Sequence, residues 1–221
     1  MNPEATEQRV RTLEAVREIK NLMARLANHH AANQQEQILG LYALGLPDVR
    51  AELPLGVYEG KAGLERLYLG MAGLDGDHRG RLHMHALTSP LIEVAGDLQT
   101  AKGIWTCPGH ATDRNPADPS SGLEAAWVWT KYGCDFVIEA GRWKIWHLRV
   151  HGIFRARYDK SWADGDEVRG APGGASAGPP PGVPRPDRPP TSWWQYRPDA
   201  VYPNDPAPPQ PYESFDDATA Y

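Results

Sequence analysis

The side chains best suited to chemistry lie on two neighbouring segments, residues 123–138 and 143–155. Both segments are rich in Val, Ile, Thr and Trp, which is typical of β-strands, and side chains alternate between the two faces of a strand. A two-residue turn at Ala140–Gly141 would set the register of the pair and place Cys134 opposite His147. One face is then predicted to hold Thr130, Tyr132, His147, Arg149 and His151.

Proton transfer is the chemistry that this patch suits. A neutral His accepts a proton near pH 7 and a protonated His donates one, while Tyr and Arg can hold a developing oxyanion or phenolate. A register error of one residue would bring Lys131 and Asp135 to the same face, so Lys131 also counts as a catalytic candidate. The sequence contains no phosphate-binding loop, dinucleotide-binding glycine pattern or Ser-His-Asp elbow, and we expect no cofactor.

Further candidates come from other segments. His83 and His85 share one face of residues 82–87 and could form a metal pair, but no third ligand stands at a convincing spacing, so we expect no metal site. For His83, a surface position or a hydrogen-bonded core position is the alternative. The residues predicted to contact a substrate are His29, His30, Tyr42, Trp105, Trp129 and Thr130.

Several of these candidates have a purely structural alternative. Histidines near a helix C-terminus, as His29 and His30 are expected to be, are favoured by the helix dipole without any role in a site. Tryptophans in strands belong more often to a core or an interface. An inward-facing Arg149 would need a partner, either an anionic group of a substrate or a carboxylate at an interface.

These residues need a scaffold of helices followed by strands. Helices are predicted at residues 7–32, 34–43 and 62–71, with a short strand at 49–53. Strand patterns follow at residues 82–87, 91–94, 100–106, 123–138 and 143–155. Helices that precede a run of antiparallel strands indicate an α+β domain, with the helices packed on one face of a curved sheet.

The composition limits the partners. The chain has 221 residues with 23 Lys and Arg against 28 Asp and Glu, and its net charge of −5 argues against a nucleic-acid groove. No apolar run approaches the roughly 20 residues that a membrane helix needs. Two cysteines exclude a disulfide framework. We therefore expect a cytoplasmic protein without nucleic-acid or membrane partners.

Proline divides the chain into two parts. Fourteen of the 21 prolines follow Lys160, so we expect a folded domain over residues 1–159 and a Pro/Gly-rich extension over residues 160–221. Aromatic residues are rare in disordered tails. The extension nevertheless contains Trp193, Trp194, Tyr196, Tyr202, Tyr212, Phe215 and Tyr221. It is therefore predicted to be an arm that lies across its own subunit or a neighbouring one.

Two segments resemble a known family. Residues 92–105, Ile-Glu-Val-Ala-Gly-Asp-Leu-Gln-Thr-Ala-Lys-Gly-Ile-Trp, and residues 141–145, Gly-Arg-Trp-Lys-Ile, follow the helices in an order that resembles the SnoaL-like branch of the nuclear transport factor 2-like superfamily. The resemblance covers residues 10–158 and implies a cone-shaped, curved antiparallel or mixed sheet packed with N-terminal helices, whose Trp-x-Ile face points into the cone. Many members carry an Asp near the end of the first helix. Residues 28–33 read Asn-His-His-Ala-Ala-Asn instead, so the adjacent histidines are candidates to replace it.

Residues 84–88, 131–136 and 143–151 look like the cofactor-independent lyases that act on lignin-derived diaryl compounds. This likeness implies a pocket role for His85 and the loss of water and formaldehyde from a phenolic substrate through a quinone methide. Fold does not decide function. A hydrolase, a polyketide-cyclase-type isomerase and a non-catalytic binding or assembly module are the alternatives. The fold and the strand tryptophans also predict a homodimer or homotrimer whose arm contacts a neighbour.

Overall fold

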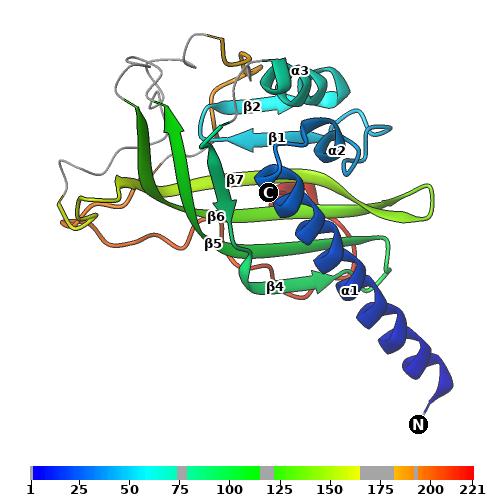
Figure 1. Cartoon of the computed structure of the whole chain (residues 1–221). Helices are drawn as coiled ribbons and strands as arrows, with labels where there is room; N and C mark the ends of the chain where they lie inside the picture. Colours follow the sequence, from blue (N-terminus) through cyan, green and yellow to red (C-terminus); the bar gives the residue numbers. More distant parts are fainter. Residues whose placement is uncertain (1, 74–78, 115–121, 165–181, 192–193) are drawn as a thin grey trace.

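The computed structural model describes residues 2–73, 79–114, 122–164, 182–191 and 194–221 (Figure 1). Its helices are α1 (Pro3–Ala31), α2 (Gln35–Leu39), α3 (Gly60–Gly73) and the 3-10 turn η2 (Asp217–Thr219). Its strands are β1 (Arg50–Leu53), β2 (Gly56–Glu59), β3 (Leu82–His85), β4 (Thr88–Val94), β5 (Thr100–Arg114), β6 (Leu123–Glu139) and β7 (Arg142–Arg157). The fold is α+β, as predicted. Among the described residues, no helix is both long and apolar enough to span a membrane.

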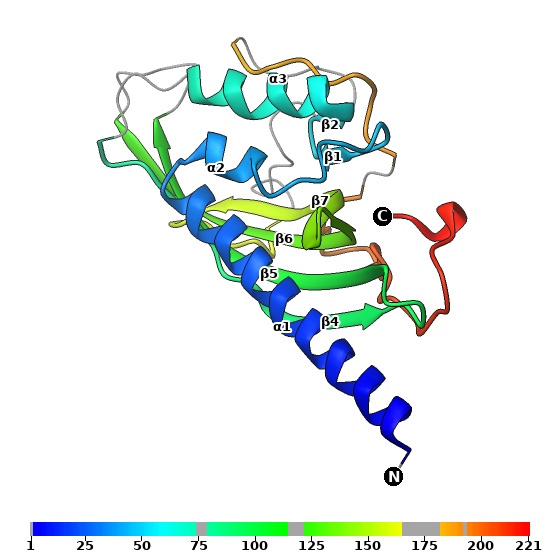
Figure 2. The ribbon, with the colours of Figure 1, turned by 90° about the vertical axis from the view of Figure 1, so that its right-hand side faces the viewer.

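Helix α1 positions the first group of candidate residues. The Asn2 side chain accepts the backbone N–H of Glu4 at 3.1 Å and so caps the first turn. One stripe of the helix is buried against the sheet and contains Ala15, Ile19, Leu22, Met23 and Leu26. The first turns project beyond the sheet in Figures 1 and 2, and Leu13 is exposed there. The helix predicted over residues 7–32 is therefore confirmed.

The strands form one mixed sheet in the order β2-β1-β7-β6-β5-β3, and β4 pairs with β5 beside β3. Strand β1 runs parallel to β7, and the other pairs are antiparallel. Strand β5 continues to Arg114, well beyond the predicted end at Thr106. The carbonyl of Pro108 accepts the Ala86 N–H at 3.0 Å, so the proline nitrogen faces the junction between β3 and β4, where its missing N–H is tolerated.

The hairpin between β6 and β7 begins in the predicted register and then leaves it. Ala140 and Gly141 have φ angles of 50° and 74°, as a two-residue type I′ turn requires, and Ile138 pairs with Trp143. Phe136 still pairs with Ile145, but the next pair is Asp135 with His147 rather than Cys134 with His147. Trp146 is thus the extra residue of a β-bulge, and the register predicted beyond it is wrong by one residue.

The bulge reverses the faces of the second half of β7. Leu148 and Val150 point to the helix side of the sheet, whereas His147 points to the opposite side, which we call the outer face. Tyr132 stays on the helix side, because it lines a cavity there with Leu148 and Val150. The five-residue patch predicted from the sequence is therefore divided between the two faces.

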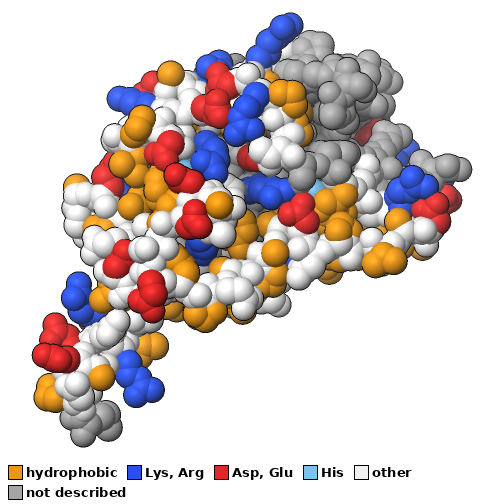
Figure 3. Space-filling view, turned by 180° about the vertical axis from the view of Figure 1, so that it is seen from behind, with side chains coloured by type: hydrophobic (Ala, Val, Ile, Leu, Met, Phe, Trp, Pro, Cys, Tyr) orange, Lys and Arg blue, Asp and Glu red, His pale blue; other side chains and the backbone are white. Residues whose placement is uncertain are grey.

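Residues 194–221 lie on the outer face, on the side of the sheet away from α1 (Figures 1 and 2). Residues 182–191 run along β2 and α3, where Tyr58 donates its hydroxyl to the carbonyl of Pro184 at 2.7 Å. From behind, acidic and basic side chains are interspersed over the surface rather than gathered by sign (Figure 3). Residues 165–181 of the predicted Pro/Gly-rich extension, and its Trp193, lie outside the described residues. The division of the chain near residue 159 stays a prediction.

Candidate active site

A cavity of about 240 Å³ lies between the helices and the sheet, and we call it the inner cavity. Its wall is mainly apolar and is built by α1, α2, α3 and strands β1, β3, β6 and β7, together with the turn after β1. The apolar lining consists of Leu26, Ala27, Ile38, Leu53, Leu55, Leu67, Met71, Leu148 and Val150. The polar lining consists of His30, Gln35, Tyr68, Arg81, His83, His85 and Tyr132. An apolar hollow with a few converging polar groups is the usual form of a small-molecule site.

Three histidines gather on one wall of the inner cavity. His83 and His85 alternate with Met84 on β3 and so project from the same side of the strand. His30 reaches them from the last turn of α1, and its ring centroid lies 5.2 Å from that of His85 and 5.9 Å from that of His83. Of the two adjacent histidines at the end of the first helix, His30 therefore lines the cavity and His29 does not. His29 donates Nδ1–H to the Gln34 side chain at 2.7 Å.

His85 has the environment of a general base. Its Nδ1 is buried and has no hydrogen-bond partner among the described residues. Gly109, opposite it on β5, leaves room for the ring, since a Cβ there would lie 3.1 Å from Nδ1. Burial, and then the nearby His83 and Arg155, lower the pKa of His85 to about 4. Its imidazole is therefore neutral at pH 7 and keeps a lone pair free to accept a proton.

Burial also lowers the pKa of His30, to about 3, with smaller contributions from His85 and His83. Each charged imidazole would oppose the charging of the next, so the resting pair is uncharged. At pH 7 both imidazoles are therefore proton acceptors rather than proton donors.

Asp113 is a site residue that the sequence interpretation missed. It lies on the distal part of β5, and its Oδ1 accepts the Nε2–H of His83 at 2.6 Å. Arg81 and Arg155 also approach the carboxylate, each at 3.4 Å. Burial alone would raise the pKa of Asp113, but these three partners outweigh it and lower the pKa, so the carboxylate stays charged. The sequence of residues 107–114 carries no clear strand signal, because Pro108 and Gly109 interrupt it.

Tyrosine hydroxyls supply hydrogen-bond donors to the same cavity. Tyr132 and Tyr68 line it, and the Tyr68 hydroxyl shares a hydrogen bond of 2.6 Å with that of Tyr42 behind the wall. Burial raises the pKa of all three well above its usual range, so they remain protonated. Tyr42, predicted at the cavity mouth, is instead fully buried and acts on the cavity only through Tyr68.

His147 lies on the outer face in a buried cluster of charges, contrary to its predicted place beside Tyr132. Its Nδ1 donates to Asp135 Oδ2 at 2.8 Å, and Lys102 Nζ donates to Asp135 Oδ1 at 2.9 Å. The backbone N–H of Tyr221, at the end of the arm, donates to Asp135 Oδ2 at 2.8 Å. Asp135 is 0% exposed, so its charge depends on these donors. The cluster joins the sheet to the arm.

Arg149 and His151 also face the arm rather than the cavity. Arg149 Nη2 forms an ion pair with Asp205 Oδ2 at 3.0 Å. His151 donates Nε2–H to the Trp194 carbonyl at 2.9 Å, and the two rings stack with centroids 4.2 Å apart. The predicted placement of both residues on the Tyr132 face is wrong, for the same reason as for His147: the bulge at Trp146 shifts the strand by one residue.

The other residues predicted for the site do not line the inner cavity. Lys131 Nζ donates to the Asn204 side chain of the arm at 2.9 Å, and Trp129 stacks on Phe154 at 5.9 Å. Neither residue lines the inner cavity. Thr130 is buried beside the cavity wall without lining it, and Trp105 is buried in a neighbouring groove. Of the residues predicted to be catalytic or to contact a substrate, the cavity brings together three: His30, His85 and Tyr132.

Within the described ranges, no group of three or more His, Cys, Asp or Glu side chains is placed to hold a metal ion. His83, considered above with His85 as a possible metal pair, directs Nε2 to Asp113.

Comparison with known proteins defines the family. The sequence profile of the SnoaL-like domain matches residues 11–149, and no curated protein sequence gives a significant match. A protein from Novosphingobium aromaticivorans DSM 12444, provisionally named a scytalone dehydratase, is 17% identical with a TM-score of 0.51, over 68% of this chain and 92% of that one. The hexachlorocyclohexane dehydrochlorinase LinA-type3 from Novosphingobium barchaimii LL02 is 14% identical with a TM-score of 0.53, over 69% and 95%.

A protein from Streptomyces avermitilis, provisionally named a dehydratase of the NTF2-like family, is 17% identical with a TM-score of 0.52, over 64% of this chain and 98% of that one. At these identities the three structures establish a shared fold. The profile match extends over most of the chain, from α1 to the middle of β7. The chain therefore belongs to the SnoaL-like domain family, with the fold of the NTF2-like proteins.

Proposed function

We propose that the protein is a cofactor-independent lyase or dehydratase that acts on a small phenolic or other aromatic compound. The observation that carries the proposal is His85, a neutral imidazole in the wall of an apolar cavity that also holds tyrosine hydroxyls. Its Nδ1 has no hydrogen-bond partner among the described residues. An elimination needs a base for the departing proton and a donor for the oxygen that gains charge. The inner cavity offers both kinds of group.

The specific reaction that we propose is the loss of water and formaldehyde from a lignin-derived diaryl compound. Tyr132 or Tyr68 donates a hydrogen bond to the phenolic oxygen of the substrate. The phenolic proton and the benzylic hydroxyl group leave as water, which gives a quinone methide. His85 then takes the proton of the neighbouring hydroxymethyl group, the C–C bond breaks and formaldehyde departs. The electron pair returns to the ring, and the proton on His85 goes to the phenolate oxygen.

Asp113 would offset part of the positive charge that His85 acquires. Its carboxylate holds a negative charge against His83, whose ring stacks on His30, and His30 in turn contacts His85. The names of two structural neighbours, a dehydratase and a dehydrochlorinase, also describe eliminations and agree with the proposal.

Turnover of two substrates tests the proposal. A 1,2-diarylpropane-1,3-diol with a para-hydroxyl group should yield a stilbene and formaldehyde, and 1-(4-hydroxyphenyl)ethanol tests the broader dehydratase class by its conversion to 4-vinylphenol. We expect His85→Gln to lower kcat by about 10²–10⁴-fold, as is usual for a general base. Tyr132→Phe should lower it by about 10²–10³-fold, as for the loss of one oxyanion donor.

The matched control is His110→Gln, because His110 is exposed on β5 and packs on Trp127. This variant should retain wild-type turnover. Full activity of His85→Gln would contradict the proposal. Binding of both compounds without any product would favour a non-catalytic binding module instead.

A further inference from the structure

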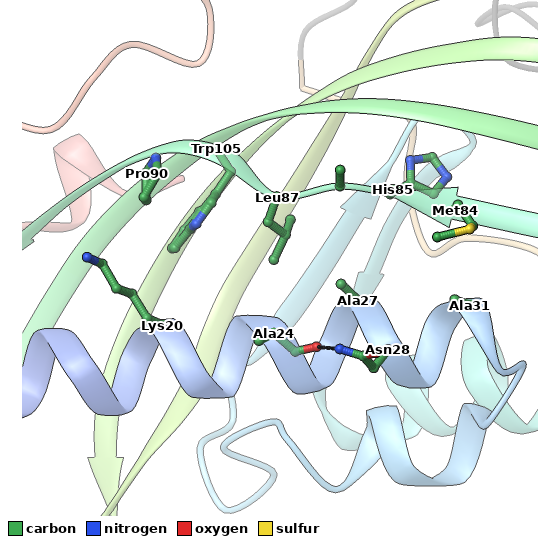
Figure 4. Close-up of a pocket in the computed structure, with 11 residues that line it drawn as sticks. Lys20, Ala24, Ala27, Asn28, Ala31, Met84, His85, Leu87, Pro90 and Trp105 are labelled. Atoms are coloured by element: carbon green, nitrogen blue, oxygen red, sulfur yellow. Dashed lines mark hydrogen bonds between the residues drawn. The ribbon is translucent and has the colours of Figure 1, made fainter.

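A second hollow of about 490 Å³ lies beside the inner cavity, between α1 and strands β3 and β4 (Figure 4). We call it the groove. Helix α1 contributes Lys20, Ala24, Ala27, Asn28 and Ala31. The strand side contributes Met84, His85, Ala86, Leu87, Pro90 and Trp105. Figure 4 shows the groove running along the helix from Lys20 and Trp105 at one end to His85 and Met84 at the other.

The groove and the inner cavity meet at His85. Both hollows are lined by His85 and by Ala27, one from the sheet and one from the helix. A bound molecule whose reacting bond lies at His85 can therefore extend in two directions. The small side chain of Ala27 is what keeps the helix from closing this passage.

The sizes of the two hollows decide how much of a molecule each can hold. An apolar cavity of about 150 Å³ is enough for benzene, so the 240 Å³ inner cavity holds one substituted ring and little more. The groove has about twice that volume. The groove therefore has room for a part of a substrate that extends beyond the ring and its reacting carbon atoms.

The floor of the groove is fixed. Trp105 is only 2% exposed, and its ring lies against Gly103, where a Cβ would come within 2.7 Å of the indole. Its edge-to-face contact with Phe136, at 6.1 Å between centroids, holds the ring from the other side. The indole therefore closes the floor of the groove with a fixed apolar edge.

Charge marks the far end of the groove. Within the described part of the chain, Lys20 is the one charged side chain in the lining, and it forms no ion pair there. Lys20 precedes Ala27 by two helical turns, which places it about 10 Å along the axis from the passage. Asn28, the other polar helix residue, already donates its amide to the Ala24 carbonyl at 2.8 Å. The charge that the groove offers to a ligand is thus the positive charge of Lys20, which lies far from His85.

We propose that the groove is a binding subsite for an extended, anionic part of the substrate, an aryl group that ends in a carboxylate at Lys20. The inference rests on the proposed function, because it takes His85 as the point at which the reacting bond lies. It adds a preference for acidic substrates that the inner cavity alone does not impose.

Binding of three unreactive probes tests the subsite. They are 4-ethylphenol, 4-[2-(4-hydroxyphenyl)ethyl]benzoate and the neutral primary amide of this benzoate, and none has a leaving group, so calorimetry reports binding without turnover. The benzoate should bind more tightly than the amide by about two- to fivefold, as for an exposed ion pair. Both two-ring probes should bind more tightly than 4-ethylphenol.

Three variants locate the effect. Lys20→Met should remove the preference for the benzoate over the amide and leave 4-ethylphenol unchanged. Arg25→Met, an exposed charge on another side of α1, is the matched control and should preserve the preference. Ala24→Phe, which fills the groove, should reduce both two-ring probes to the affinity of 4-ethylphenol.

The subsite is contradicted if the benzoate binds no more tightly than 4-ethylphenol, or if Lys20→Met and Arg25→Met weaken it equally. The same experiments distinguish a failure of the subsite from a failure of the proposed lyase reaction. Probe binding as expected without turnover of any diol would overturn the proposed reaction and leave the groove as a binding subsite for aromatic carboxylates.

Discussion

At the scale of single residues, burial gives each histidine its properties. His85 is half-buried, and its Nδ1 is buried without a hydrogen-bond partner among the described residues, so the charged form of the imidazole is disfavoured. His147 is more deeply buried, at 1% exposure, and donates Nδ1–H to the Asp135 carboxylate. The first arrangement suits proton transfer to and from a ligand, and the second fixes one part of the fold to another.

The low pKa of His85 predicts how stability depends on pH. Its pKa is about 4 in the folded chain and near 6.5 in the unfolded chain, so below pH 6.5 the unfolded chain binds a proton that the folded chain does not. The free energy of unfolding should therefore fall as the pH falls from 6.5 towards 4. Between pH 7 and pH 5, the wild type should lose about 1–2 kcal/mol more than His85→Gln.

Urea denaturation at pH 7 and pH 5 measures this difference. The exposed His110→Gln serves as the control and should lose as much stability as the wild type. If His85→Gln and the wild type respond equally to pH, His85 is not held neutral by burial, and its assignment as the base loses its main support.

At the scale of elements, the periodicity of the sequence predicted most of the scaffold but neither the extra residue of the bulge nor the distal half of β5. Local sequence is enough to predict α1, α3 and the turn at residues 140–141. The bulge at Trp146 does not, because distant partners hold it. The Trp146 indole donates to Asp48 at 2.9 Å and contacts Phe215 of the arm at 4.4 Å between centroids. No window around residue 146 contains these residues.

The same bulge explains which part of the candidate site could be predicted. Histidines on β3 need only alternation to share a face, and Tyr132 on β6 lies on the cavity side. His147 and Arg149 depended on the register across the hairpin, where one residue changes the face. Asp113 was missed because the Pro108–Gly109 pair looks like a strand end, although β5 continues through it at the junction of β3 and β4.

At the scale of the whole molecule, the arm covers a polar sheet face. Lys102 illustrates this: its ammonium donates to the Thr219 carbonyl at 2.9 Å and lies 4.6 Å from the centroid of the Phe215 ring. Arg50 donates to the Tyr221 carbonyl at 2.7 Å. Without the arm, the buried charges around Asp135 would face water or a second copy of the chain.

Removal of residues 194–221 should therefore destabilise the domain. A loss of about 2 kcal/mol would lower the melting temperature by roughly 4–8 °C for a chain of this size. Gly133→Val gives a milder test, because a Cβ at this position would lie 2.7 Å from the Tyr221 ring and would push the end of the arm away. Thermal unfolding and size-exclusion chromatography measure both variants, and unchanged melting temperature and size would show that the arm stabilises neither fold nor assembly.

The central claim is that the reacting part of a substrate lies in the inner cavity beside His85, on the helix side of the sheet. A crystal structure of the full chain with bound 4-ethylphenol tests it most directly. We predict that the ring lies among Leu26, Leu67 and Val150, with its hydroxyl hydrogen-bonded to Tyr132 or Tyr68 and its ethyl carbons next to His85. A ring bound on the outer face, beside His147, would contradict the account.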